Sequence, residues 1–526
     1  MRYETRVGGT YAKYVLFVMT IVYVFNFIDR QILSILAEPI KADLGLSDAD
    51  LGFLYGTAFA VFYAVFGIPL GRLADTWHRV RLVSIGLSFW SLMTALSGFS
   101  RNFVQLALCR FGVGIGEASA SPATFSMLSD YFSPRVRAIV IAIYSGGLYI
   151  GAGIGIFLGG AITDTWNAAY PDPMLAPLGL RGWQAAFLAV GMPGILLAFW
   201  VWTLREPVRG MSEGLEPPPA RNPIKETLGE LRRVMPLVSA IPNGSGALLI
   251  NFIAGVVINV AVWLLYLVTG DIVQWVAMGI GVWAFFSWAQ GLLAQDPASF
   301  ALILRSRAMI YTVIGFPMMS FVTYGVGFWG PAYMVRTFDI SLTDAGRWLG
   351  LGAAIGGFIG ITLGGWLGDT LRARTRKGRM YVGYIAVALM IPCAVVFAYT
   401  NNVVVAYVAS FFFSIASPLW VAIPPATVND LVLPRMRALA SAFYIVMPTF
   451  LGLALGPYMM GFVSDQLVQS GLSDAESLRL SMLSGLLVLV PGIVLIYFAS
   501  QHLEADEDSR IERARAAGEV VEMVEG

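Results

Sequence analysis

The chain has 526 residues, of which 57% are hydrophobic and only 13% charged, and its mean hydropathy is +0.72. Soluble domains are about 45–50% apolar and about 25% charged, so most of this chain must face lipid. The net charge of +1 gives no reason to expect a nucleic-acid partner. Cys109 and Cys393 fall in apolar stretches, where they are expected to pack as small hydrophobes, so no metal or other cofactor is predicted.

Apolar stretches long enough for membrane-spanning helices, which need about 20 residues, recur along the chain. They lie near residues 14–36, 49–71, 82–99, 103–128, 137–163, 183–204, 244–269, 272–294, 308–335, 345–368, 380–400, 403–429, 436–463 and 480–500. The predicted fold class is an all-α polytopic membrane protein with about 14 transmembrane helices in groups of six, two and six. The predicted regions are an N-terminal six-helix bundle (1–204), a cytoplasmic linker with an amphipathic helix and two extra transmembrane helices (205–307), a C-terminal six-helix bundle (308–500) and a cytoplasmic tail (501–526).

Basic residues are concentrated in alternate short loops, and this sets the predicted orientation. Arg79 and Arg81 mark one such loop and Arg135 and Arg137 the next, whereas the intervening loops are acidic or neutral. Basic loops stay on the cytoplasmic side of a membrane. Both termini are therefore predicted to be cytoplasmic, with the protein in the plasma (inner) membrane if it is bacterial.

The two six-span blocks repeat one another in sequence. Three landmarks recur in the same order: Leu-Ser-Asp-Ala at 46–49 and Leu-Thr-Asp-Ala at 342–345, Gly-Arg-Leu-Ala-Asp at 71–75 and Gly-Trp-Leu-Gly-Asp at 365–369, and an aspartate followed by Pro-Arg-x-Arg at 130–137 and 430–437. We therefore predict two bundles with pseudo-twofold symmetry and the pair 244–294 inserted between them. Ser47 and Thr343 are the predicted N-caps of the paired second spans.

Glycine recurs every fourth residue in two of the predicted spans. One stripe consists of Gly147, Gly151, Gly155 and Gly159, and the other of Gly352, Gly356, Gly360, Gly364 and Gly368. Each stripe alone indicates close packing between helices. Their presence in both halves favours a seam along which the halves approach and slide, as in alternating-access carriers built from parallel repeats.

The apolar stretch 103–126 carries two charged residues, Arg110 and Glu117. In a helix, seven residues place them within about 20° of the same face and about 10 Å apart along the axis. Asp29 and Arg30 lie at a matching depth in the first span, about 12–14 Å from its outer end. Charges in a membrane span tend to face a bundle interior or a water-filled cavity, so these residues predict a polar cavity. Two ion pairs that only hold the first and fourth helices together remain the alternative.

Residues 71–81, Gly-Arg-Leu-Ala-Asp-Thr-Trp-His-Arg-Val-Arg, resemble the loop signature of the major facilitator superfamily, with departures at Thr76 and His78. The resemblance implies a major facilitator fold and ion pairs that latch one state of a carrier. The gate or latch residues that it implies are Asp75, Arg79, Asp130, Arg135 and Arg137 in the first half and Asp369, Asp430, Arg435 and Arg437 in the second.

Within the superfamily, Asn-Phe-Ile-Asp-Arg at 26–30 and Arg-Phe-Gly-Val-Gly-Ile-Gly-Glu-Ala-Ser at 110–119 resemble spinster-like transporters. Members of that group move lysophospholipids and sphingoid phosphates, and proton coupling is often proposed for them. The resemblance implies a secondary active transporter that works by alternating access on an amphipathic anionic lipid. Its other expected partners are protons and the bilayer, and a monomer is expected. The inserted pair is not expected of the group's twelve-span core.

The predicted substrate-binding residues are Arg30, Arg110, Asn26, Tyr324 and Trp329, and the predicted proton-coupling residues are Asp29 and Glu117. Arginine suits bidentate recognition of phosphate or carboxylate, and ionised carboxylates nearby would compete for it. The seventh span adds aromatic side chains without an interior charge. Such a cavity suits an amphipath with an anionic head and an apolar tail.

Other classes of protein fit the sequence less well. The histidines, His78 and His502, lie in a loop and in the tail, and the sequence has no HExxH, no cysteine pair at metal spacing and no phosphate-binding Gly-Lys-Ser/Thr. These features argue against a membrane enzyme and an ATP-driven pump. A receptor or passive scramblase remains open. Among carriers, the alternative is a proton-coupled exporter of drugs or small organic anions, because Gly-Leu-Ala-Leu-Gly-Pro at 452–457 resembles the superfamily's antiporter motif.

Overall fold

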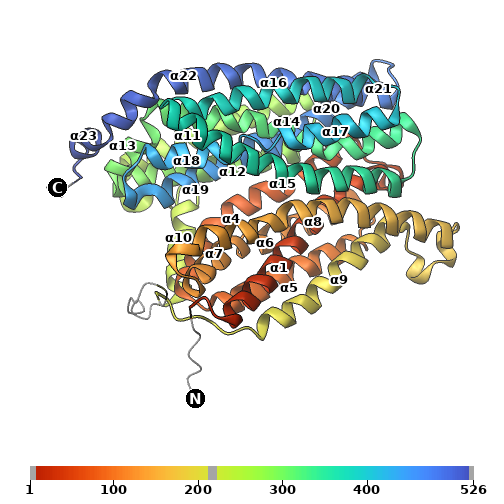
Figure 1. Ribbon diagram of the computed structural model, residues 1–526, viewed down its shortest axis with the longest axis horizontal. Coiled ribbons are helices and arrows are strands. Elements are labelled where there is room, and N and C mark those ends of the chain that lie inside the picture. Colours follow the sequence, from red (N-terminus) through yellow and green to blue (C-terminus); the bar gives the residue numbers. More distant parts are fainter. Residues whose placement is uncertain (1–6, 211, 213–221, 520–526) are drawn as a thin grey trace. The chain divides into compact units, whose positions relative to one another are not determined.

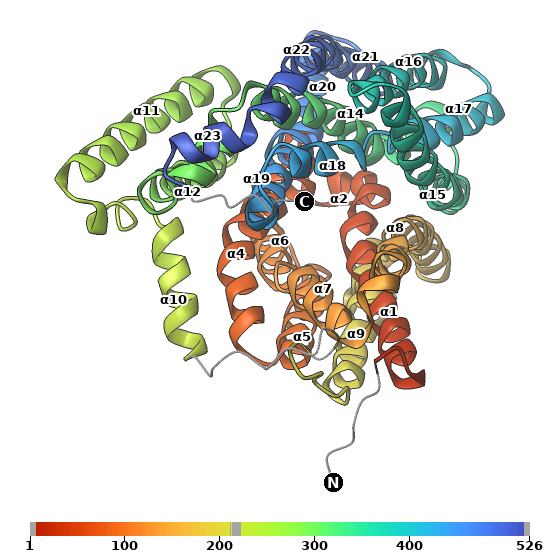
Figure 2. The same cartoon turned by 60° about the vertical axis from the view of Figure 1, so that its left-hand side comes forward.

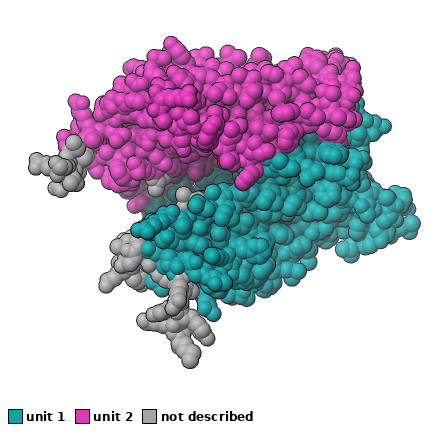
Figure 3. Space-filling model, in the orientation of Figure 1, with its two compact units in different colours: residues 1–232, 330–355 teal, residues 233–329, 356–526 magenta. Residues whose placement is uncertain are grey.

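The computed structural model describes residues 7–210, 212 and 222–519, and within these ranges the chain is helical without a β-strand. The chain divides into two compact units, which Figure 3 shows in separate colours. Unit 1 consists of Met1–Arg232 and Gly330–Ile355, and unit 2 consists of Arg233–Trp329 and Gly356–Gly526.

The N-terminal part of the chain, red to yellow in Figure 1, folds into helices α1 to α10. They are α1 (Thr10–Ile35), α2 (Ala37–Leu44), α3 (Asp48–Tyr55), α4 (Thr57–Thr76), α5 (Arg79–Ser97), α6 (Phe103–Glu117), α7 (Ala120–Tyr131), α8 (Pro134–Ala169), α9 (Gly182–Trp202) and α10 (Pro223–Val234). Short 3₁₀ turns at Pro173–Leu175 and Pro177–Gly179 lie between α8 and α9.

The rest of the chain begins with a helical hairpin, α11 and α12, which Figure 2 shows side by side. The helices are α11 (Ser245–Thr269), α12 (Ile272–Gln295), α13 (Pro297–Leu304), α14 (Arg307–Phe338), α15 (Leu342–Arg374), α16 (Gly378–Tyr399), α17 (Val403–Ala416), α18 (Ile423–Asp430), α19 (Arg437–Met447), α20 (Leu455–Gln469), α21 (Asp474–Gly485), α22 (Leu489–Asp508) and α23 (Arg510–Ala516). Short helical turns lie at Ile241–Asn243, Pro434–Met436, Pro448–Ala454 and Leu486–Val488.

Twelve helices of the described residues are long and apolar enough to cross a membrane. The predicted spans 103–128 and 403–429 are not among them, because each is divided into two shorter helices, α6 with α7 and α17 with α18. Proline explains both breaks. Pro122 has no N–H for the Ala118 carbonyl, and Pro418 follows Ser417, the residue that caps the end of α17. The total of about fourteen crossings therefore stays a prediction.

One of the two predicted N-caps is confirmed. The Asp50 N–H donates to Ser47 Oγ at 3.0 Å and the Ser47 N–H donates to Asp50 Oδ2 at 3.1 Å, so α3 begins with a capping box. The prediction for Thr343 is wrong, because α15 begins one residue earlier. Thr343 Oγ1 instead donates to Asp164 Oδ2 at 2.6 Å and ties the start of α15 to α8.

The glycines of the first stripe contact α1, and those from Gly356 to Gly368 contact α17 and the residues after it, so these glycines do not form the predicted seam between the halves. A Cβ at Gly155 would lie 2.9 Å from Ile28 Cα, and this stripe holds α8 against α1. A Cβ at Gly364 would collide with the Leu419 carbonyl oxygen, and this stripe holds α15 against α17 and the residues that follow it. The spacing identified the closely packed face of each helix but not the helix that packs on it.

A different set of glycines brings α8 and α15 together inside unit 1. A Cβ at Gly350 would lie 2.5 Å from the Gly153 carbonyl oxygen, and one at Gly346 would lie 2.7 Å from the Ile156 carbonyl oxygen. Because α15 begins in unit 1 and continues in unit 2, this contact fastens its first turns to the N-terminal helices.

The linker segment predicted to be amphipathic forms α10. Ile224 and Leu228 on its apolar face are 69% and 53% exposed. On the acidic face, Glu226 Oε2 accepts a hydrogen bond from Arg72 Nη2 of α4 at 2.6 Å. The helix is thus fixed to α4 by its charged face and leaves its apolar face uncovered within the structure.

Candidate functional site

An ion pair joins the first and fourth predicted spans. Arg30 Nε on α1 donates to Glu117 Oε2 on α6 at 2.6 Å, and the two side chains are 17% and 0% exposed. Glu117 is the last residue of α6, where Pro122 and the turn at Ala118 end the helix. The break in this span therefore positions the carboxylate that holds Arg30.

Aromatic rings surround the Arg30 guanidinium. Its Cζ atom lies 4.9 Å from the ring centre of Phe27, 4.3 Å from that of Phe59 and 5.0 Å from that of Tyr63. Phe59 and Tyr63 are one turn apart on α4 and stack on each other, with ring centres 5.3 Å apart. Among the described residues, the terminal nitrogens of Arg30 have no hydrogen-bond partner. A cation held between rings with two donor groups still available is suited to bind an anion beside an apolar group.

Arg110 lies deeper in unit 1 than Arg30. It is 1% exposed, and its Nε and Nη1 donate to the main-chain carbonyls of Leu54 and Asp29, each at 3.3 Å. The guanidinium therefore links α6 to α3 and α1. In this arrangement Arg110 supports the Arg30 site without being open to a ligand.

Several polar atoms around the ion pair have no hydrogen-bond partner within the described ranges. These atoms are Asn26 Oδ1, Glu117 Oε1 and both carboxylate oxygens of Asp29, and all of them are buried. Asn26 neighbours Glu117, whereas Asp29 faces Thr94 and Trp90 of α5. Asp29 therefore points into the helix bundle of unit 1, away from Arg30, which is the next residue on α1. Buried polar atoms without partners are uncommon, and a functional role is one explanation for them.

The two aromatic residues predicted in the seventh span belong to unit 2. Trp329 is 0% exposed, and its Nε1 donates to the Pro457 carbonyl at 2.9 Å, so its indole packs between α14 and α20. Tyr324 is partly exposed on α14. Of this pair, Tyr324 is the side chain that remains accessible within unit 2.

The predicted latch of the first half is centred on Arg79, which is 0% exposed. Its Nη1 donates to Asp130 Oδ2 at 2.5 Å, and its Nε donates to Glu206 Oε1 at 2.7 Å. Asp75 and Arg135 form no ion pair with another described residue, and Arg137 donates to the Ser129 carbonyl at 3.1 Å. We call Arg79, Asp130 and Glu206 the Arg79 cluster; Glu206 was not among the predicted residues.

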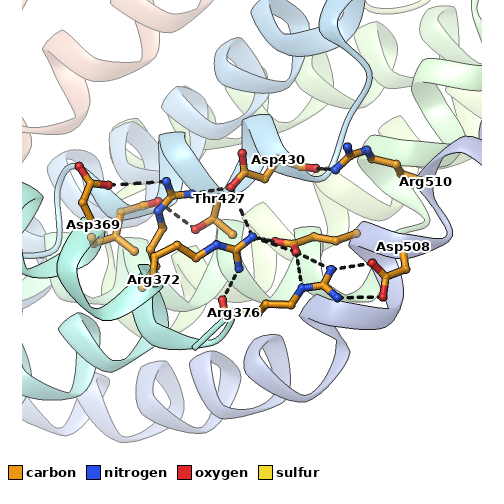
Figure 4. Close-up of polar contacts among 10 residues, drawn as sticks. Asp369, Arg372, Arg376, Thr427, Asp430, Asp508 and Arg510 are labelled. Atoms are coloured by element: carbon orange, nitrogen blue, oxygen red, sulfur yellow. Dashed lines mark hydrogen bonds and ion pairs between the residues drawn. The ribbon is translucent and has the colours of Figure 1, made fainter. Parts of the chain in front are cut away.

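A second cluster in unit 2 is shown in Figure 4, in which Asp369, Arg372, Arg376, Asp430 and Asp508 are labelled. Arg379 Nη1 lies 2.5 Å from Asp430 Oδ2, and its Nη2 lies 3.7 Å from Asp369 Oδ1. Glu507 accepts from Arg372 at 2.9 Å and from Arg376 at 2.8 Å. We call these residues the Arg379 cluster.

The other two predicted latch residues of the second half lie apart from this cluster. Arg435 pairs with Asp296 at 2.8 Å and also with Glu519, whereas Arg437 has no ion pair in the part of the chain that is described. The hydrogen bond from Arg435 holds the pKa of Asp296 well below its usual range, and the Ser299 donors add to this effect. Arg435 thus ties the start of α13 to the end of the described tail.

The Arg79 and Arg379 clusters are spaced alike in the sequence. Arg79 and Asp130 are 51 residues apart, and so are Arg379 and Asp430. Each cluster also contains a glutamate that follows the sixth predicted span of its half: Glu206 pairs with Arg79, and Glu507 pairs with Arg372 and Arg376. Neither glutamate lies in a sequence motif. The signal that could have indicated them is that each follows the corresponding arginine, Arg79 or Arg379, at a similar distance along the chain.

A further charged cluster of unit 1 was also missed. The Arg336 side chain at the end of α14 is 5% exposed, and its Nη2 lies 2.7 Å from both Glu38 and Asp48. Lys41 adds a contact to Asp48 at 2.7 Å. In the sequence, Asp48 belongs only to the Leu-Ser-Asp-Ala landmark at 46–49, and nothing there indicates its distant arginine partner.

Comparison with known proteins identifies the family to which this architecture belongs. A family model described as Major Facilitator Superfamily matches residues 19–457. The chain belongs to this superfamily. Its members are transporters, so the chain is a multi-pass integral membrane transporter and not an enzyme, as the sequence predicted.

The predicted likeness to spinster-like members of the superfamily is confirmed as well. The chain is 25% identical to the sphingosine-1-phosphate transporter SPNS2 of Mus musculus, over 90% of this chain and 73% of that one. It is also 25% identical to an MFS-type efflux pump of Mycolicibacterium smegmatis, over 93% of this chain and 92% of the pump. A crystal structure of a bacterial homolog to human lysosomal transporter spinster, in an inward-facing and occupied conformation, has the same fold. Its TM-score is 0.69 at 24% identity, covering 95% of this chain and 98% of that one.

Proposed function

We propose that this superfamily member moves an amphipathic anionic lipid, such as a lysophospholipid or a sphingoid phosphate, by proton-coupled alternating access. The observation that carries the proposal is the environment of Arg30: a partly exposed guanidinium held between three aromatic rings and one carboxylate. The cation suits a phosphate or carboxylate head, and the rings suit the adjoining apolar chain. Likeness to a sphingosine-1-phosphate transporter supports the same class of substrate.

In the proposed mechanism, the substrate head competes with Glu117 for Arg30. Glu117 occupies Nε and leaves the terminal nitrogens to a bidentate ligand. While Glu117 is ionised, it neutralises part of the charge that attracts the substrate. Loss of that negative charge on protonation would release Arg30 to the substrate.

Asn26 allows Glu117 to exist in either protonation state. Glu117 Oε1 and Asn26 Oδ1 are both buried acceptors without a donor, and the Asn26 side chain lies beside Glu117. A proton on Glu117 would give Asn26 Oδ1 a donor, whereas an ionised Glu117 would be served by the amide turned to present Nδ2. We assign the proton-coupling role first to Glu117, with Asp29 as the second carboxyl and Arg110 as the cation that positions both.

The topology of the proposal follows the distribution of arginines. With fourteen crossings, including the two spans broken by proline, both termini and the Arg79 and Arg379 clusters would be cytoplasmic. The Arg336 cluster would then lie at the opposite side of the membrane. Accessibility of single cysteines at these positions to a membrane-impermeant reagent tests the assignment.

The proposed function is tested by transport into liposomes containing the purified protein, with and without a pH gradient. Lysophosphatidate is compared with glycerol phosphate, which has the head without the tail, and with monoacylglycerol, which has the tail without the phosphate. Selective transport of lysophosphatidate that requires Arg30 and responds to the gradient supports the proposal. Equal transport by Arg30→Gln protein, or no response to the gradient, contradicts it.

The second candidate is a proton-coupled exporter of drugs or small organic anions. Likeness to the M. smegmatis efflux pump, which extends over nearly the whole of both chains, favours it. The two candidate functions differ in whether the substrate needs a long apolar tail. Transport of glycerol phosphate or a lipophilic drug in preference to lysophosphatidate would favour the exporter.

A further inference from the structure

Helix α11 is the most exposed of the candidate membrane spans. Only 17% of its most apolar stretch is buried, compared with 39% or more in each of the other candidate spans. Its hairpin partner α12 connects to the rest of unit 2: Phe285 stacks on Phe443, and Tyr458 donates to Asp271 at 2.6 Å. In Figure 2, α11 lies on the outer side of this hairpin.

Two asparagines on α11 differ in how their hydrogen-bonding groups are used. Asn251 is 0% exposed; its Oδ1 accepts from Leu237 N and Trp283 Nε1, and its Nδ2 donates to Ser287 and Gln290. Asn251 therefore fastens α11 to α12 with no polar group left over.

Asn259, eight residues later, is exposed. Its Nδ2 donates to the Gly255 carbonyl at 2.8 Å, but its Oδ1 has no partner among the described residues. Asn259 is the fifteenth residue of the 25 in α11, so it lies about 3 Å from the middle of the helix. No water is available at that depth in a bilayer, and an amide facing acyl chains is unfavourable.

A groove of about 420 Å³ runs beside Asn259 along α11. It is lined almost wholly by apolar groups, including Leu237, Phe252, Trp263 and Trp283. From residue 252 to residue 264 the lining covers about 18 Å of the helix axis. The feature that needs an occupant is thus an apolar groove with one unpaired acceptor in the centre of the membrane.

We propose that α11 is a docking surface for α11 of a second copy of this chain, with the two Asn259 side chains hydrogen-bonded to each other. An acyl chain would fill the groove but has no donor for Asn259 Oδ1. Two copies inserted in the same orientation place Asn259 at the same depth, so each amide meets a group that can both donate and accept. A large apolar side chain from each copy would fill the groove of the other. This dimer departs from the monomer expected above.

The test uses the full-length chain in native membranes with Cys109 and Cys393 replaced by alanine. Asn259→Cys is compared with Val257→Cys, which is exposed at nearly the same depth but about 160° around the helix. On oxidation, we expect a disulfide-linked dimer from Asn259→Cys and none from Val257→Cys. A dimer formed equally by both variants, or by neither, overturns the proposal.

A second measurement does not depend on cysteine geometry. Energy transfer between donor- and acceptor-labelled copies in liposomes gives the dissociation constant of the dimer as the protein-to-lipid ratio changes. Asn259→Leu should weaken association by about three- to tenfold, because hydrogen bonds between membrane helices are modest, and Val257→Leu should leave it unchanged. Native mass spectrometry that finds only a monomer with a retained lipid would assign the groove to that lipid and exclude the dimer.

Discussion

Replacement of Glu117 by glutamine tests the proposed coupling directly. In the wild type, Arg30 Nε lies 2.6 Å from the Glu117 carboxylate. The glutamine amide keeps an acceptor at this position but removes the negative charge that competes with the substrate. A charge-assisted hydrogen bond is about twice as strong as a neutral one, and about 1.4 kcal/mol is a factor of about ten in affinity. At pH 7.5 the variant should therefore bind the anionic substrate about tenfold more tightly than the wild type. As the pH falls, its affinity should change only as the phosphate of the ligand itself takes up a proton, because the second pKa of a phosphate monoester is about 6.

Binding of lysophosphatidate to purified protein from pH 5.5 to 8.5, together with gradient-driven flux, measures both effects. Glu206→Gln is the matched control, because Glu206 also accepts from an arginine, at 2.7 Å, but lies outside the Arg30 site. The control should keep the pH dependence of the wild type. Unchanged pH dependence in Glu117→Gln would refute the role of Glu117, and the same loss in both variants would show that the effect is not specific to Arg30.

Three further predictions concern packing and the charge clusters. Gly364→Ala should abolish the monodisperse peak in size-exclusion chromatography, because the new Cβ would collide with the backbone that faces it. Gly365→Ala, whose Cβ would lie 4.0 Å from its nearest neighbour, should keep the peak, and equal behaviour would contradict the packing. Arginine lowers the pKa of Asp296 below its ordinary value of about 3.9, so this ion pair stabilises the fold fully above that value and is lost only as the pH falls through the lowered pKa. Asp296→Asn should therefore leave the pH dependence of transport between pH 5 and 8 unchanged, and a shifted profile would refute this. Arg79→Gln should cost about 3–5 kcal/mol of stability by leaving partly buried carboxylates unpaired, whereas Asp75→Asn should change it by less than about 0.5 kcal/mol; thermal unfolding in detergent compares them.

Length, periodicity and apolar composition predicted most of the helices from the sequence. The two spans that the structure divides contain the reason for their division, since Pro122 and Pro418 remove backbone donors. The glycine stripes were harder to interpret. A four-residue period identifies a closely packed face, but which helix occupies that face depends on contacts from distant parts of the chain, as for Gly155 on α1.

The sequence predicted which residues make up the candidate site, but not the direction in which each side chain points. Asp29 and Arg30 are adjacent in the sequence, and adjacent residues of a helix point about 100° apart, so their side chains leave α1 in different directions. The structure turns Arg30 toward Glu117 and Asp29 toward α5. The rings of Phe59 and Tyr63 were missed because aromatic residues are common in membrane spans, and only the position of Arg30 gives these two a role.

Within the charge clusters, burial and ion-pair distance distinguish residues that can change ion-pair partners from residues that cannot. Arg79 is 0% exposed and bound to two carboxylates, so breaking its contacts would leave charges unpaired at a cost of several kcal/mol. Asp369, in contrast, is 82% exposed and 3.7 Å from Arg379, and exposed pairs contribute about 0–1 kcal/mol. A carrier must change contacts in every cycle without unfolding its bundles. We therefore infer that the Arg79 cluster and the pairs of Arg379 with Asp430 and of Glu507 with Arg372 and Arg376 stay intact within their units. The motif aspartates, Asp75 and Asp369, are the residues that we expect to exchange ion-pair partners.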